Sequence, residues 1–389
     1  MITAPKPTRP RVSDNDQPLR VGLSGAGLIA HAHLGAYRDF PSRVALTSVC
    51  DVNAEAANSM AALVRDDVAV FADFDEMLAS GRVDAVDICT PHDVHATQAL
   101  TAAEHGKHIF IEKPMACSLA EAAVMVEAAD SASVTMMVGQ VLRYLPNYAG
   151  IRHAVNSGEL GTVWWARADS WMPLTVPGRD PVGGDHWMRD GARAGGGVLS
   201  MLGTHHIDLF RYLFGEVTTV FARVWTDNPL YRNGAEDRAV ATLTFDNGVV
   251  AHLSTSYSSR TPHMHQFMLL GDRGTIYTSL PTADLEIVAA AAQHQAPAVL
   301  WSTEQEASGD PGFSTVAEWR DGLVGDDAFT NEVLHFEHCV RTGVEPISSG
   351  YDNLRTMEVL YACYESARVG QQLNVAETAA GLLAAHRLA

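Results

Sequence analysis

The feature that most constrains the fold of this chain is a glycine-rich turn between a strand and a helix near the N-terminus. The apolar run Leu19–Ser24 is typical of a buried strand, and Gly25-Ala26-Gly27-Leu28-Ile29-Ala30 follows it directly as a GxGxxA pattern. Such glycines let the backbone approach a pyrophosphate, and the N-terminus of the next helix supplies amide donors and a positive dipole end. We predict a Rossmann-type dinucleotide site with the cofactor's phosphates at Gly25, Gly27, Leu28 and Ile29.

Asp51 extends this prediction to the ribose of the dinucleotide. It ends the next expected strand, Ala45–Cys50, and lies 24 residues beyond Gly27. A carboxylate there accepts hydrogen bonds from both ribose hydroxyls and repels a 2′-phosphate. Val52 and Asn53 follow, so no adjacent arginine favours that phosphate, and we predict NAD rather than NADP. Asp51 could instead cap the helix expected from Asn53, and the two roles are compatible.

Three more apolar runs alternate with Ala-rich stretches of helical spacing: Ala85–Cys89, His108–Ile111 and Val134–Val138. This alternation predicts βαβ units and a parallel sheet, which binds ligands at the carboxyl ends of its strands. The motif Glu112-Lys113-Pro114 follows one of these ends. A partly buried Lys113 would have a lowered pKa and could relay a proton, whereas the alternative is a solvated lysine at a strand end.

After about Tyr148 the pattern changes to consecutive strands joined by tight turns, which predicts an antiparallel sheet. The expected strands are Val163–Trp171, Val217–Trp225, Arg238–Phe245, Val249–Tyr257, Gln266–Leu270 and Thr275–Thr278, and helices are expected at 204–214, Phe329–Gly343 and Asp352–Gly370. We therefore predict an α/β protein with a disordered leader at 1–18, a parallel-sheet Rossmann domain at 19–147, and an α+β domain with an open, largely antiparallel sheet at 148–389.

A second group of polar residues follows the triplet Gly195-Gly196-Gly197, which would allow a ligand to approach the backbone closely. His205 and Asp208 are three residues apart and share one helical face. His205 could act as a general base toward a hydroxyl proton. The alternative is a histidine packed at a domain interface, and the residues alone do not decide between the two.

Composition excludes several classes of function. The formal net charge of −19 argues against nucleic-acid and anionic membrane surfaces, both of which attract clustered lysine and arginine. No apolar run reaches the roughly 18–20 residues of a membrane-spanning helix, and the start of the chain lacks a secretory signal. Five scattered cysteines favour buried thiols in a cytoplasmic protein. The pairs His31/His33 and His335/His338 lack evident further ligands, so we predict no metal site.

These motifs together resemble the glucose-fructose oxidoreductase, inositol dehydrogenase and rhizopine-catabolism family (Gfo/Idh/MocA) over about residues 19–372. The resemblance rests on the GxGxxA turn, Cys50-Asp51, Thr90-Pro91 with His95, Glu112-Lys113-Pro114, Gly139 with Arg143-Tyr144, the Gly195–Asp208 block and Glu365-Ser366-Ala367. It implies a Rossmann domain joined to an α/β domain whose open sheet often forms oligomer contacts. It also implies oxidation or reduction of sugars and cyclitols with NAD(P).

The resemblance assigns roles to individual residues. Lys113 and His205 correspond to the catalytic residues of the family. The cofactor is expected to contact Thr90, Pro91, His95, Glu112, Lys113 and Arg143, besides the glycine turn and Asp51. The substrate is expected to contact Lys113, Tyr144, Trp187, Arg189, Met201, His205 and Asp208, where Trp187 and Arg189 come from the loop Trp171–Arg193, whose aromatic and basic side chains suit a sugar.

Met201 departs from the family, which usually has an aspartate four residues before the catalytic histidine. If that aspartate stabilises protonated Lys113, its absence leaves Lys113 more easily deprotonated, unless Asp185 or Asp190 compensates. The function we predict is NAD-dependent hydride transfer to or from a ring hydroxyl or ketone of a sugar, glycoside or cyclitol, in a cytoplasmic homo-oligomer (a dimer or tetramer) that contacts through the C-terminal sheet. The alternatives are glycoside cleavage by oxidation, elimination and reduction with bound NAD, and a non-catalytic dinucleotide-dependent sensor.

Overall fold

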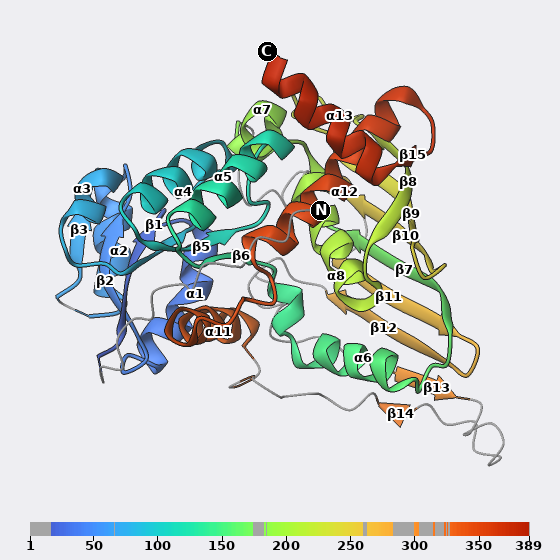
Figure 1. Ribbon diagram of the computed structural model, residues 1–389, viewed down its shortest axis with the longest axis horizontal. Coiled ribbons are helices and arrows are strands. Elements are labelled where there is room, and N and C mark those ends of the chain that lie inside the picture. The colour runs from blue at the N-terminus through green and yellow to red at the C-terminus, as the bar shows by residue number, and fades with distance from the viewer. Residues whose placement is uncertain are drawn as a thin grey trace. The chain divides into compact units, whose positions relative to one another are not determined.

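The chain forms two compact units in a computed structural model (Figure 1). The structure describes residues 17–65, 67–173, 183, 185–259, 263–282, 299–302, 314–315, 323, 325 and 327–388. The leader predicted at 1–18 lies outside these residues except for Gln17 and Pro18. Within the described residues, no helix is both long enough and apolar enough to cross a membrane.

The first unit contains a parallel sheet of six strands in the order β3-β2-β1-β4-β5-β6. The strands are β1 (Leu19–Ser24), β2 (Val44–Cys50), β3 (Ala69–Phe71), β4 (Ala85–Ile88), β5 (His108–Glu112) and β6 (Met136–Gly139). The chain order reverses between β1 and β4, which is the switch point where open parallel sheets bind ligands. Sequence analysis missed β3, because three half-buried residues at the sheet edge carry little hydrophobic periodicity.

Helices connect these strands and cover both faces of the sheet: α1 (Leu28–Asp39), α2 (Ala54–Ala62), α3 (Phe74–Ala79), α4 (His95–Glu104) and α5 (Leu119–Ser131). Figure 1 shows α4 and α5 along one face and α1 along the other. The N-cap of α2 is Asn53, whose side chain accepts from the amides of Glu55 and Ala56. The alternative role of Asp51 as the cap of this helix is therefore wrong.

The segment Phe329–Leu354 also belongs to the first unit, although sequence analysis assigned it to the C-terminal domain. It contains most of α11 (Ala328–Thr342), which lies on the α1 face of the sheet (Figure 1). The Phe336 ring stacks 5.6 Å from that of Phe110 on β5, and Ser348 accepts from the amide of Val138 on β6. A domain boundary predicted from sequence order alone does not show that a helix far along the chain packs against the first sheet.

The second unit contains a nine-stranded sheet in the order β14-β13-β12-β11-β7-β10-β9-β8-β15, counted over the described residues. Its strands are β7 (Val163–Trp171), β8 (Val217–Trp225), β9 (Arg238–Phe245), β10 (Val250–Ser256), β11 (His263–Gly271), β12 (Gly274–Thr282), β13 (Val299–Ser302), β14 (Ser314–Thr315) and β15 (Leu373–Asn374). All pairs are antiparallel except β7 with β10. The predicted α/β class and the largely antiparallel second sheet are confirmed.

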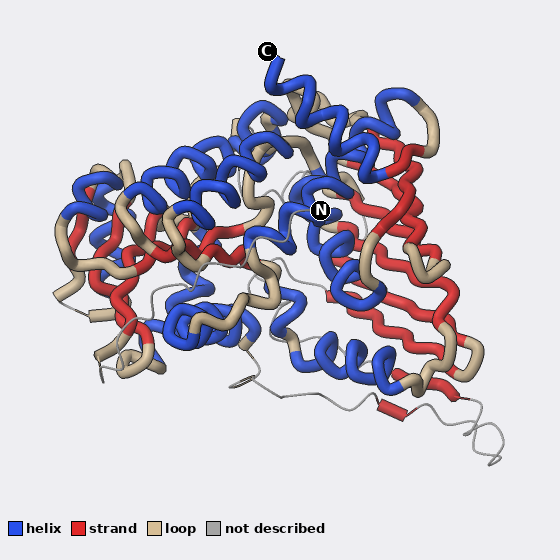
Figure 2. The backbone as a smooth tube through the Cα atoms, in the orientation of Figure 1, coloured by secondary structure: helices blue, strands red, loops and turns tan. Residues whose placement is uncertain are grey.

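The second unit also contains the helices α6 (Pro146–Ser157), α7 (Gly191–Ala194), α8 (Thr204–Phe214), most of α12 (Gly350–Val369) and α13 (Val375–Leu388). Figure 2 shows the helices gathered beside one face of the strands. A π-helix, Leu199–Gly203, leads directly into α8. Large apolar side chains on several strands are exposed, including Trp164, Phe221 and Val240.

Candidate functional site

In the glycine turn of the first unit, the backbone conformation and close packing require a glycine at Gly25, whereas the space around Gly27 is open. Gly25 has a φ of 91°, and a Cβ there would lie 2.7 Å from the carbonyl oxygen of Cys89. Gly27 would bring a Cβ within 4 Å of nothing, and it caps α1 without a side-chain hydrogen bond. The first amides of α1 thus lack a side-chain cap, and the backbone at Gly27 is open, which suits a pyrophosphate.

Asp51 connects the end of β2 to this turn. Its Oδ2 accepts from the Ala26 amide at 2.7 Å, and its Oδ1 accepts from the Asn53 amide at 2.7 Å. These bonds fix the carboxylate beside the glycine turn while the residue remains only half-buried. The position fits the predicted ribose contact, because each carboxylate oxygen can accept more than one hydrogen bond.

A chain of polar side chains continues along the carboxyl edge of the sheet. Thr90 donates from Oγ1 to Gln98 at 2.9 Å, and Gln98 donates to Ser24 Oγ at 3.0 Å. The buried His95 ring contacts the carbonyl oxygens of Thr90 and Pro114 at 3.0 and 3.1 Å, and burial lowers its pKa. His95 therefore holds the turn after β4 to the turn after β5.

Lys113 follows β5 at this same edge and is half-buried. Burial lowers the pKa of Lys113, and the charge of Glu112 opposes that shift. The Glu112 carboxylate accepts from the backbone amide of Lys113 at 3.1 Å. A lysine whose pKa lies below its ordinary value exchanges a proton more readily near neutral pH, as the sequence analysis expected.

In the second unit the triplet Gly195-Gly196-Gly197 is required by packing within the protein. A Cβ on Gly195 would lie 2.8 Å from the Cys117 Cα, and one on Gly197 would lie 2.0 Å from the Glu236 carbonyl oxygen. At Gly196, which has a φ of 138°, a Cβ would lie 2.0 Å from the Tyr364 hydroxyl. The structure thus shows close internal packing at this triplet, while the expected approach of a ligand to its backbone stays a prediction.

Glu236, which sequence analysis missed, holds the start of this block. Its buried carboxylate accepts from the amides of Gly197 and Leu199 at 2.9 and 2.8 Å and from the Tyr364 hydroxyl at 3.1 Å. Burial raises the pKa of Glu236 to about 7 against these bonds. Nothing in the local sequence signals the role, because Glu236 lies 39 residues from Gly197.

The three functional candidates of this block differ in exposure. His205 is half-buried at the first turn of α8, and Met201 is 5% exposed within the π-helix. Asp208 is 1% exposed and forms two hydrogen bonds to Arg143, from Nε at 2.7 Å and Nη2 at 2.6 Å. Asp208 was predicted to contact the substrate and Arg143 the cofactor, whereas in the structure the two side chains pair with each other.

The loop expected to set specificity is described only in part, because residues 174–182 and 184 lie outside the described residues. Trp187 is half-buried, and the buried Arg189 guanidinium donates to the Gly183 carbonyl. Tyr144, the other expected substrate contact, is 1% exposed. The acids suggested as replacements at Met201 both pair with one arginine: Asp185 and Asp190 lie 2.9 and 3.1 Å from Arg232.

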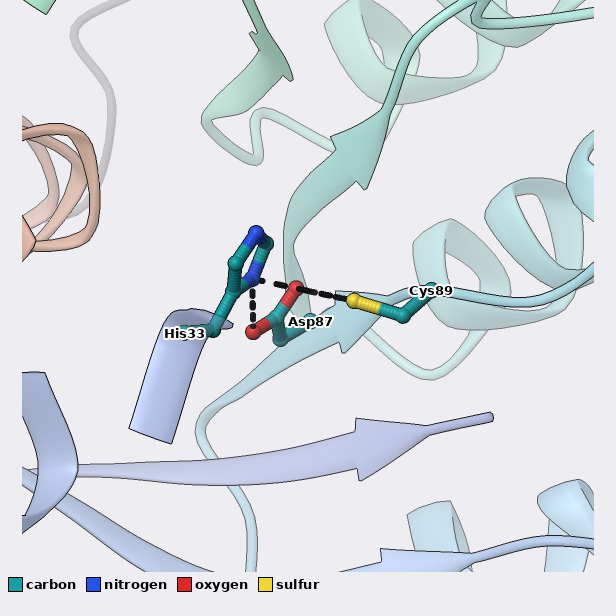
Figure 3. A group of neighbouring side chains, drawn as sticks. All are labelled: His33, Asp87 and Cys89. Atoms are coloured by element: carbon teal, nitrogen blue, oxygen red, sulfur yellow. Dashed lines mark hydrogen bonds and ion pairs between the residues drawn. The ribbon is translucent and has the colours of Figure 1, made fainter. Parts of the chain in front are cut away.

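In each of the two histidine pairs, the two members lie in different surroundings. His31 is exposed and contacts the Gly27 carbonyl, whereas His33 is fully buried beside Asp87 and Cys89 (Figure 3). His335 accepts from the Ile347 amide, and His338 is exposed. All five cysteines are free, as expected.

Comparison with known proteins supports this architecture. Residues 19–140 match the family model described as "Oxidoreductase family, NAD-binding Rossmann fold", and residues 148–277 match the Gfo/Idh/MocA C-terminal domain. Together the two models cover more than half of the chain.

Curated relatives and solved structures agree in length with this chain. D-apiose dehydrogenase of Paraburkholderia graminis is 29% identical over 91% of this chain and 88% of its own length. The scyllo-inositol 2-dehydrogenase (NAD(+)) of Bacillus subtilis is 28% identical over 79% of this chain and 82% of its own. A structure of levoglucosan dehydrogenase in complex with NADH and levoglucosan superposes with a TM-score of 0.81 at 24% identity, covering 92% of this chain and 99% of that one.

The expected family and cofactor are therefore confirmed by the two domain models. The glycine turn, the open backbone at Gly27 and the fixed carboxylate of Asp51 supply the local chemistry that such a cofactor needs. The chain belongs to the Gfo/Idh/MocA family of NAD-dependent oxidoreductases.

Proposed function

We propose that this protein is an NAD-dependent dehydrogenase that interconverts a ring hydroxyl and a ketone on a sugar or cyclitol. The observation that carries the proposal is Lys113: a half-buried lysine with a lowered pKa, placed where β5 ends at the ligand-binding edge of the sheet. Perturbed lysines at such positions mark candidate catalytic groups.

The proposed chemistry divides between cofactor and protein. Bound NAD supplies the hydride acceptor. Lys113 orients the substrate hydroxyl through its Nζ and offsets the negative charge that develops on the oxygen as the proton leaves. His205, whose imidazole is half-buried at the first turn of α8, accepts that proton as the general base. Asp51 selects NAD over NADP, since its fixed carboxylate repels a 2′-phosphate.

The substrate class is supported by the names of the relatives. The matched proteins include dehydrogenases of D-apiose, of scyllo-inositol and of levoglucosan, all of them polyhydroxylated compounds. Their identities of 27–29% leave the individual substrate open to experiment. A cytoplasmic location and a homo-oligomer formed through the second sheet stay predictions.

The test is an NADH absorbance assay with NAD and a panel of myo-inositol, scyllo-inositol, D-apiose and levoglucosan. Lys113→Ala should abolish turnover on any active substrate while NAD still binds. Lys107→Ala is the matched control, because Lys107 lies just before β5 and its Nζ donates to a backbone carbonyl, that of Val83. Full activity of Lys113→Ala contradicts the catalytic assignment.

The same panel separates the two alternative functions. Tightly held cofactor with no net NADH but with cleavage of a glycoside indicates the oxidation, elimination and reduction sequence. NAD binding without turnover of any compound indicates a sensor.

A further inference from the structure

A cluster of buried polar side chains lies under the proposed catalytic edge of the first unit. His33 and Tyr37 lie on successive turns of α1. Asp87 and Cys89 lie two residues apart and so share one face of β4 and its extension, where Figure 3 shows them beside His33. Asp87 Oδ2 accepts from the Tyr37 hydroxyl at 2.7 Å and lies 2.8 Å from His33 Nδ1. Cys89 Sγ lies 3.4 Å from the other oxygen of Asp87.

The opposite nitrogen of His33 faces two further acids. Its Nε2 lies 3.3 Å from Oε1 of Glu112, at the end of β5, and 3.8 Å from Oε1 of Glu332, on α11. His33 and Glu332 are fully buried, and Glu112 is 6% exposed. Both ring nitrogens thus face carboxylate oxygens, which accept but do not donate hydrogen bonds when ionised, so a doubly protonated ring matches its surroundings. The Nε2 contacts are ion pairs without hydrogen-bond geometry.

The packing around the ring supports a charged imidazole. The His33 ring stacks on that of Phe110 with 5.3 Å between ring centres and lies 5.7 Å from the Phe329 ring, so aromatic side chains also border it. Burial alone disfavours the charge, but Asp87 and Cys89 outweigh burial and raise the pKa of His33 well above its ordinary value. Among the described residues of this unit, the titratable groups with printed distances to the ring or to Asp87 include Tyr37, Asp87, Cys89, Glu112 and Glu332.

Glu112 connects this cation to Lys113. Its Oε1 faces His33, while its Oε2 accepts from the backbone amide of Lys113 at 3.1 Å. The neighbouring strand leaves space for the carboxylate, because a Cβ on Gly139 would lie 2.9 Å from Glu112 Oε1. The carboxylate is thus held from two sides, by a buried cation and by the backbone that carries the proposed catalytic lysine.

We propose that His33 is a positioning residue for Lys113: as a buried imidazolium it holds Glu112 against the Lys113 backbone and balances the Glu112 charge. Without that cation, the Glu112 carboxylate attracts the Lys113 ammonium, and the lysine loses its readiness to exchange a proton. The inference rests on the proposed function of Lys113 but can be tested without a substrate.

The test exploits the lysine content of the chain, which is only Lys6, Lys107 and Lys113. NMR of the NAD-free protein labelled with ¹³C at the lysine ε carbon gives three assignable signals, and a pH titration reads the pKa of Lys113 directly. His33→Gln should raise that pKa by about one unit, because an uncompensated acid beside an ammonium favours the charged form. The proposal is overturned if the pKa of Lys113 is the same in His33→Gln as in the wild-type protein.

Tyr37→Phe is the matched control, since it removes one side-chain donor to Asp87 and leaves Cys89 and the His33 ring in place. It should lower thermal stability without moving the Lys113 titration. An equal shift in both variants shows general loosening of the cluster and overturns the proposal. In a Glu112→Gln background, His33→Gln should have no further effect on Lys113, because the influence passes through Glu112.

Two measurements on the wild-type protein keep the inference falsifiable if His33→Gln does not fold. ¹⁵N-histidine NMR should show both nitrogens of His33 protonated across neutral pH, and one unprotonated nitrogen contradicts the imidazolium. Metal analysis of the purified protein should find less than stoichiometric divalent metal. A stoichiometric ion whose removal by chelator changes the His33 signals shows that Glu112 and Glu332 bind a metal with a neutral His33, and overturns the proposal. Loss of catalysis in Lys113→Ala is independent of all these outcomes.

Discussion

Replacing either member of the Arg143–Asp208 pair should destabilise the second unit far more than replacing both. The two hydrogen bonds, at 2.7 and 2.6 Å, join side chains that are 3% and 1% exposed. Removing one partner leaves a buried charge uncompensated, at a cost of about 3–5 kcal/mol, whereas an apolar replacement of both is close to neutral. We therefore expect a large decrease in the free energy of unfolding for Arg143→Met and for Asp208→Leu, and a small decrease for the double variant.

Two neighbours moderate the size of each loss. The Arg143 guanidinium lies 5.0 Å from the centre of the Tyr212 ring, and this cation–π contact remains when Asp208 is replaced. Thr356 donates to Asp208 Oδ1 at 3.2 Å and remains when Arg143 is replaced. The coupling free energy between the two positions should still be about 3 kcal/mol or more, at the top of the range for residues in direct contact.

Tryptophan fluorescence during urea unfolding measures this coupling in the correct unit. All seven tryptophans lie between residues 164 and 319, inside the second unit, so the signal does not report the Rossmann unit. If Arg143 and Asp208 served only the cofactor and the substrate, each single variant would keep the wild-type unfolding midpoint and lose activity. Two results would contradict the prediction: a decrease in the free energy of unfolding of less than about 1 kcal/mol in each single variant, or a decrease in the double variant equal to the sum of the two single decreases.

Four further perturbations follow from the structure. The pKa of Glu236 is raised from 4.5 to about 7, so its contribution to the free energy of unfolding is present below pH 4.5 and is lost as the pH rises through 7. Over that range the wild-type protein should lose about 3 kcal/mol of stability that Glu236→Gln does not lose, and urea unfolding of both proteins at pH 5 and pH 8 measures the difference. Gly25→Ala should unfold or strongly destabilise the first unit in thermal melts, whereas Gly27→Ala should melt near the wild-type temperature and weaken NAD binding in calorimetry, because only Gly25 contacts the protein closely. Asp51→Ala should narrow the preference for NAD over NADP at least tenfold in the ratio of kcat/KM, and an unchanged ratio excludes its role as the discriminating carboxylate. Phe221→Glu should reduce the molar mass in light scattering if the exposed apolar strands of the second sheet form an oligomer interface.

Much of the fold follows from local patterns in the sequence. The limits of β1, β7, β8, β9 and α8 coincide with the expected ones, because strand alternation and helical periodicity report directly which face of an element is buried. The glycine turn was also predictable, since a strand, a tight turn and a helix N-terminus form from consecutive residues. The short strand β3 and the inclusion of α11 in the first unit were not, because they depend on packing between distant segments.

By itself, the sequence determined that a dinucleotide site opens the chain, that Asp51 and Lys113 end strands at its ligand-binding edge, and that the family is Gfo/Idh/MocA. Only the tertiary structure decided which charges meet. His33 faces an acid 299 positions away on α11, and Asp208 pairs with Arg143 across 65 positions. Burial makes such pairing compulsory, because an ionised side chain removed from water must find an opposite charge or hydrogen bonds. Periodicity in a sequence shows that a residue is buried, but not which partner it meets there.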